Sequence, residues 1–194
     1  VDWRRRVIHV EPTDLPGAAR WIGGGGAAMT ASVAQAVRDV LCGADPVGVQ
    51  MSRRAQARLE ELRLERSWVR TGATSVVIDS AGRSRWWTFA GRRANLWLAS
   101  LVAPLRRQVS AVDDLGLALD DHTTLSMLRE LLDQIEWPGE VTLTEWISDD
   151  AVENLKFVDC IPRPLAVAEV EARLRDDRAV AEVLREPLTT TQLS

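Results

Sequence analysis

The chain has 194 residues, of which 46% are hydrophobic and 27% charged, and this composition is typical of a globular protein and excludes a disordered one. No apolar run approaches the ~20 residues that a membrane-spanning helix needs, and no apolar stretch follows the basic N-terminal residues, as it would in a signal peptide. Two cysteines without metal-ligand spacing favour the reducing cytoplasm.

The net charge of −4 conceals a strong asymmetry between the two halves of the chain. Residues 1–107 hold 17 Arg and 9 acidic residues, a net charge of +8. Residues 108–194 hold 7 basic and 19 acidic residues, a net charge of −12. A basic part beside an acidic part is typical of a protein in which one surface meets phosphates and the other meets solvent or a neighbouring domain.

The first predicted elements are two strands, over 3–11 and 18–22, and the second runs into four consecutive glycines, Gly23 to Gly26. Trp21 stands beside Arg20 directly before this run. The glycines indicate either a flexible loop or a mobile hinge that presents Trp21 to a partner.

Two helices are predicted next, each with a hydroxyl residue at its N-cap. Arg53 and Arg54 lie in the first turn of the second helix, where the helix dipole disfavours cations, so they hint at an anionic partner outside the chain. The helices run from Thr30 to Cys42, with Val33, Val37, Val40 and Leu41 on the apolar face, and over 53–69 after Ser52, with Ala55, Leu59 and Leu62 inward.

The centre of the sequence predicts a β-hairpin over 74–79 and 84–90, followed by a corner at Gly91 and a helix that ends at Val102. Strand alternation places Trp86 with Thr88 on one sheet face and Trp87 with Phe89 on the other. The helix opens with Arg92, Arg93 and Asn95 beside its free backbone N–H groups, a geometry that suits an anion. An ordinary core strand before a solvated helical turn has the same pattern.

The acidic half predicts a second hairpin and a mainly helical C-terminal part. The predicted class is therefore α+β, with an antiparallel sheet built from hairpins and packed against several helices. The elements are strands over 109–112, 115–119 and 141–144, and helices from Thr123 or Thr124 to Ile135, from Ser148 to Lys156, from Pro164 to Arg175 with Leu165, Ala168, Ala172 and Leu174 inward, and over 179–185, before a frayed tail.

Motifs for enzymatic chemistry are absent from the sequence. It contains no Walker phosphate loop, no Gly-x-Ser-x-Gly, no His-Glu-x-x-His and no Cys-x-x-Cys. His9 on a strand and His122 at a helix start are explained by ordinary structural positions. We therefore predict no catalytic residue and no metal ligand in this chain.

The order of several segments resembles the large helicase-related (Lhr-type) superfamily 2 helicases of the DEAD/DEAH box group. The resemblance covers about residues 1–188 and concerns the helicase-associated region after the motor and winged-helix domains. It rests on Val-Glu-Pro at 10–12, Arg-Trp-Ile-Gly-Gly-Gly-Gly at 20–26, Ser-Arg-Arg-Ala at 52–55, Trp-Trp-Thr-Phe-Ala-Gly at 86–91 running into Arg-Ala-Asn at 93–95, and Lys-Phe at 156–157 before Ile-Pro at 161–162 and Leu165.

The resemblance implies a parent protein that hydrolyses ATP with Mg²⁺ in its motor domains and moves along single-stranded DNA, or RNA. Trp21 is then the position expected to stack on a base of the tracked strand. Residues 1–188 form the accessory domain, with a basic part over 1–107 and an acidic helical part over 108–188, and 189–194 form the tail. The candidate nucleic-acid contacts are Trp21, Arg20, Arg53, Arg54, Arg92, Arg93, Asn95 and Trp86.

A second hypothesis is that the chain docks on other proteins. It then braces the motor domains or a partner protein, and its aromatic residues are interface anchors without strong DNA binding. The acidic half fits this role, because it has no evident use on a polyanion.

Overall fold

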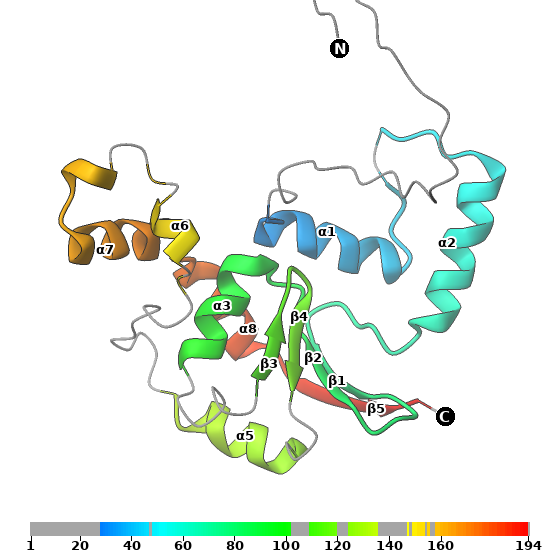
Figure 1. The fold of residues 1–194 in the computed structure, drawn as a ribbon. Helices are drawn as coiled ribbons and strands as arrows, with labels where there is room; N and C mark the ends of the chain where they lie inside the picture. The colour runs from blue at the N-terminus through cyan, green and yellow to red at the C-terminus, as the bar shows by residue number, and fades with distance from the viewer. Residues whose placement is uncertain are drawn as a thin grey trace, which may run out of the picture.

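The described part of the chain forms one five-stranded sheet with helices packed on both of its faces (Figure 1). This arrangement confirms the predicted α+β class. The computed structural model describes residues 28–46, 48–101, 109–119, 124–135, 147, 149–153, 155 and 158–193. The predicted strands over 3–11, 18–22 and 141–144 and the glycine run lie outside these residues.

Four strands form the two predicted hairpins, and the strand order across the sheet is β3-β4-β2-β1-β5. Within the first hairpin Asp79 N–H donates to Arg83 O at 3.0 Å, and Gly82 has a φ of +81° that closes the turn. The two hairpins join through antiparallel pairing of β2 with β4. The four strands are β1 (Thr74–Ile78), β2 (Ser84–Trp87), β3 (Val109–Val112) and β4 (Gly116–Leu119).

The C-terminal residues form a fifth strand, β5 (Leu188–Gln192), where the sequence predicts a frayed tail. β5 pairs in parallel with β1 over five residues, and the hydroxyls of Ser75 and Thr189 lie 2.8 Å apart. The prediction is wrong because this tail has no apolar periodicity of its own, and its β-branched threonines become a strand only beside β1. Strands from the acidic half thus complete the sheet that the basic half begins.

Capping residues set the starts of three helices where the sequence predicts them. The side chains of Thr30, Ser52 and Thr124 accept hydrogen bonds from the backbone N–H of Val33, Ala55 and Met127. The helices are α1 (Ala31–Leu41), α2 (Arg53–Glu65), α3 (Gly91–Leu101), α5 (Leu125–Asp133), α6 (Asp149–Glu153), α7 (Arg163–Leu174) and α8 (Asp177–Arg185), with a 3-10 turn at Val158–Cys160.

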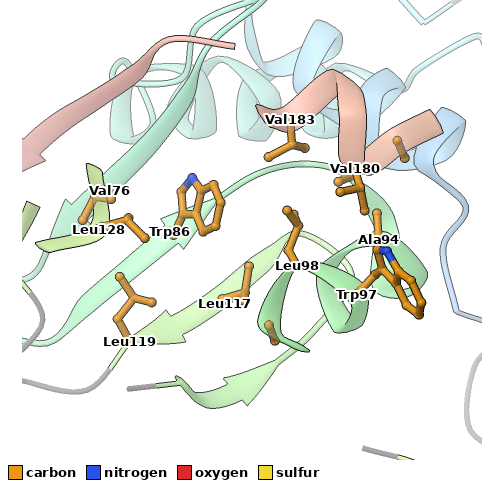
Figure 2. Close-up of a cluster of buried hydrophobic side chains, with 13 residues drawn as sticks. Val76, Trp86, Ala94, Trp97, Leu98, Leu117, Leu119, Leu128, Val180 and Val183 are labelled. Atoms are coloured by element: carbon orange, nitrogen blue, oxygen red, sulfur yellow. The ribbon is translucent and has the colours of Figure 1, made fainter. Parts of the chain in front are cut away.

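The main core lies between one face of the sheet and helices α3, α5 and α8. Trp86 of β2 and Leu117 of β4 project from the sheet toward Leu98 of α3 and Val180 and Val183 of α8 (Figure 2). The other sheet face carries a smaller core, which consists of Trp68, Val69, Val77 and Phe89 with partly buried Val37, Leu41, Trp87 and Leu115. The two Trp of β2 therefore lie on opposite faces, as alternation predicts.

The buried faces of three helices differ from the predicted ones. On α1 Val33 is exposed and Ala34 and Arg38 are buried instead. α2 ends at Glu65 and has no buried residue; its Ala55 is exposed. On α7 Ala166 and Val170 face α6, while Leu165, Ala168 and Ala172 are exposed. α7 carries apolar residues on two sides of the helix, and packing against α6 buries only one of these sides.

Candidate nucleic-acid interface

Two residues that the sequence predicts to contact nucleic acid are buried in the structure. Trp86 is 1% exposed and belongs to the main core, and Asn95 is 0% exposed. The Asn95 amide is used inside the fold, because Nδ2 donates to Asp113 O at 2.8 Å and Oδ1 accepts from the Thr88 hydroxyl. Asn95 thus ties the end of β2 to the turn between β3 and β4. This burial corrects both assignments; Trp21 and Arg20 lie outside the described residues.

The four predicted arginines on helix starts are exposed, but the fold keeps them in two separate pairs. Arg92 and Arg93 lie where α3 meets the start of α1, whereas α2 meets the end of α1 through Arg63, which donates to Val40 O at 3.0 Å. Figure 1 accordingly shows α2 and α3 at opposite ends of α1.

The start of α3 does not offer all the free donors that the sequence predicts. The N–H of Arg92 donates to Met29 O at 3.3 Å, so the chain before α1 satisfies a group that was expected to meet an anion. A Cβ at Gly91 would lie 2.7 Å from the same oxygen, which shows how closely the two backbones approach. This terminus is primarily a packing contact.

A groove of about 550 Å³ lies elsewhere, on the sheet face opposite the main core. It crosses the sheet from Ala118 of β4 through β2 and β1 to Leu193, which directly follows β5. Its wall also includes the segment that leaves α2 and the turn between β1 and β2. The groove is lined by Glu65, Arg66, Trp68, Val77, Asp79, Arg83, Ser84, Arg85, Trp87, Ala118 and Leu193.

Guanidinium groups and aromatic rings gather around Trp87 in this groove. The Cζ atom of Arg85 lies 4.3 Å from the centroid of the Trp87 ring, and that of Arg66 lies 5.2 Å from it. Trp68 and Phe89 flank the same ring, with centroids 5.3 Å and 5.9 Å away. Both distances from the guanidiniums fall within the range of cation–π attraction. Trp87 nevertheless is not fully buried, and its side chain lines the groove.

Local structure explains how these groups come together. Arg85 and Trp87 are two residues apart on β2 and therefore project from the same face. Arg66 and Trp68 belong to the segment that follows α2. This helix ends at Glu65, four residues earlier than predicted, so Trp68 reaches the sheet. Alternation was a sufficient signal for the Arg85–Trp87 pair, but no local signal in the sequence places Arg66 or Trp68 beside it.

Two of the three arginines in the groove have acidic partners. Arg85 pairs with Asp113, and Arg83 Nη2 lies 2.7 Å from Asp79 Oδ2. Arg66 has no ion pair among the residues that the structure describes, and its guanidinium lies over the Trp87 ring. Glu65, which also lines the groove, pairs with Arg58 outside it, so Arg66 is the one groove arginine without an acidic partner among the described residues.

The acidic partners are held in their charged forms. Partial burial raises the pKa of the Asp113 carboxyl, but the hydrogen bonds from Arg85 and from the N–H groups of Leu115 and Gly116 outweigh it, and the pKa falls below its ordinary value. For Asp79 the hydrogen bond from the Arg83 N–H, joined by that from the Arg83 guanidinium, lowers the pKa. Both arginines are thus oriented by carboxylates that stay ionised at neutral pH.

Comparison with protein families, curated proteins and solved structures finds nothing that matches the chain. The residues that the structure describes hold no cluster of three or more His, Cys, Asp and Glu side chains placed for a metal ion. None of the helices in the described ranges combines the length and apolarity that a bilayer crossing requires.

Proposed function

We propose that this chain is an accessory nucleic-acid-binding domain of an ATP-dependent DNA helicase, where it contacts the tracked single strand by aromatic stacking and by arginine–phosphate contacts. The observation that supports this function is the open groove in which Arg66 and Arg85 lie against the half-buried ring of Trp87. Aromatic and guanidinium planes are the surfaces on which bases stack, whatever their sequence.

The proposed parent is a cytoplasmic helicase of the Lhr type, in which ATP and Mg²⁺ act in motor domains outside this sequence. Support for the parent comes from the order of the segments that resemble that group. The partners are single-stranded DNA, with RNA as the alternative, and the motor and winged-helix domains of the same protein. In this role the chain binds the single strand, while the motor domains move along it.

Binding of a fluorescently labelled single-stranded oligonucleotide, followed by anisotropy, tests the proposal. Arg66 is the one groove arginine without an acidic partner among the described residues. The slope of log K against log salt is about −0.7 for each phosphate contact, so one such contact lowers the affinity about threefold between 50 and 200 mM salt. Saturable binding with this salt dependence is expected. No binding at low salt, or an affinity that ignores salt, contradicts a nucleic-acid-binding role.

The second candidate function is a brace that docks on the motor domains, and apolar surface on the C-terminal part favours it. Leu165 is 60% exposed and lines a second groove of about 450 Å³ with Leu155 and Ile161. Failure to bind oligonucleotides, together with binding to separately produced motor domains that Leu165→Asp abolishes, would establish this function in place of the first.

A further inference from the structure

We infer that the groove at Trp87 holds one unpaired base of a single strand, and that the strand crosses the sheet from β4 toward β5. The inference rests on the proposed function and deepens it, because it names the part of the nucleic acid that this groove takes. Among the described residues, Trp87 is then the main side chain on which a base stacks.

The course of the groove defines the path. The groove touches β4 at Ala118, β2 at Arg85 and Trp87 and β1 at Val77, and it ends beside Leu193. These strands are neighbours in the sheet in that order, so the groove runs across them. Helices α3, α5 and α8 fill the opposite face. Of the aromatic side chains that the structure describes, Trp87 on this face is the one that is not fully buried. A sheet face with accessible aromatic rings is a common platform for single-stranded nucleic acids.

The balance of charge indicates that stacking dominates over phosphate attraction at this site. Asp113 and Asp79 pair with Arg85 and Arg83, and Glu65 of the groove wall pairs with Arg58 outside it. Of the three arginines in the groove, Arg66 is the one without an acidic partner among the described residues. A ligand that offered phosphates alone would gain little binding free energy in this groove. A ligand that also offers a flat π surface would stack on the Trp87 ring or on the guanidinium planes beside it.

The same geometry favours unpaired bases. A base inside a duplex already has both faces stacked on its neighbours and must be extruded, at a cost, before it can enter a pocket. The flanking segment after α2 and the turn at Asp79 and Arg83 make the site a recess rather than a flat surface. A duplex therefore presents phosphates to the groove along its length, and only its two terminal base pairs have a free face.

Three ligands of equal length test the inference by anisotropy at low salt: a mixed-sequence single strand, the corresponding blunt duplex, and a strand composed of abasic residues. The single strand should bind between about fivefold and about a hundredfold more tightly than the other two, which is the range for stacking of one base. Equal affinity for the abasic strand or for the duplex would overturn the inference.

Substitutions locate the stacking site. Trp87→Leu and Arg66→Gln should each weaken binding of the single strand and reduce its advantage over the abasic strand. Arg178→Gln is the matched control, because Arg178 is an exposed arginine of α8 that pairs with Glu182 far from this groove. Thermal unfolding checks each variant, and if Trp87→Leu does not fold, Arg66→Gln alone decides.

The outcomes separate the two levels of the proposal. Absence of binding to any oligonucleotide contradicts the proposed function itself. Binding that prefers the single strand but is unchanged by both Trp87→Leu and Arg66→Gln leaves the proposed function intact and overturns the assignment of the base to this groove.

Discussion

Substitution of Gly91 by alanine should destabilise the protein through a contact that the equivalent substitution of Gly82 lacks. The two glycines have nearly the same positive φ, +79° at Gly91 and +81° at Gly82. A Cβ at Gly82 would meet nothing within 4 Å, whereas at Gly91 it would lie 2.7 Å from Met29 O and 2.8 Å from Ala31 N. The pair therefore isolates the close approach of α1 to the corner before α3.

The expected magnitudes follow from these contacts. A positive φ costs alanine about 1 kcal/mol at either position. At Gly91 the neighbouring atoms belong to the backbone and cannot rotate away, so overpacking adds about 1–3 kcal/mol. Displacement of Met29 also weakens the hydrogen bond from Arg92 N–H, which contributes about 1 kcal/mol. Gly91→Ala should thus lower the free energy of unfolding by about 3–5 kcal/mol, and Gly82→Ala by about 1 kcal/mol.

Urea unfolding followed by circular dichroism measures both values, and the thermal midpoint of Gly91→Ala should fall about 5–15 °C below that of Gly82→Ala. Equal losses in the two variants would refute the reasoning. They would mean that the start of α1 moves away from the corner without cost, and that the contact of α1 with α3 does not contribute to stability.

Three further predictions concern polar side chains that form hydrogen bonds or ion pairs within the fold. Asn95→Ala should cost about 2–4 kcal/mol in urea unfolding, because it leaves the Thr88 hydroxyl and Asp113 O without their buried partner; a loss below 1 kcal/mol would argue against this role. Glu186→Ala should cost about 2–4 kcal/mol because Arg38, 5% exposed, loses a two-pronged ion pair at 2.6 and 2.8 Å; unchanged stability is the contrary result. The depressed pKa of Asp113 stabilises the fold above the ordinary aspartate pKa of about 4, and this contribution is lost as the pH falls through the folded-state value. The stability difference between the native chain and Asp113→Asn should therefore shrink between about pH 6 and about pH 3, and a constant difference would contradict the assignment.

Local features of the sequence determined much of the secondary structure. The caps at Thr30, Ser52 and Thr124 depend on hydrogen bonds that reach only three residues along the chain. The hairpin of β1 and β2 closes through the short turn at Gly82. In α5 the predicted apolar residues pack on the main core, because a single unambiguous stripe leaves one orientation open. Elements of this kind can be predicted from neighbouring residues.

Competing local patterns were resolved only by tertiary structure. Two apolar arcs run along α7, and contact with α6 buries the one that contains Ala166 and Val170. Asn95 lies in a helical turn that the sequence predicts to be solvated. Its amide is nevertheless buried and bonds to Thr88, which follows β2, and to Asp113 in the turn between β3 and β4. β5 has no signal of its own and depends on β1 for its hydrogen bonds.

The candidate site divides in the same way. The sequence by itself determined that Arg85 and Trp87 share a sheet face, because side chains alternate along a strand. The sequence also shows that the arginines are concentrated in residues 1–107, and this positive charge is what favours an anionic partner. Only the tertiary structure decided that Arg66 and Trp68 reach that face, since the contact depends on where α2 ends and how the chain returns to the sheet. Contacts between residues far apart in the chain depend on the packing of the whole fold, and they cannot be predicted from the local propensities of the residues involved.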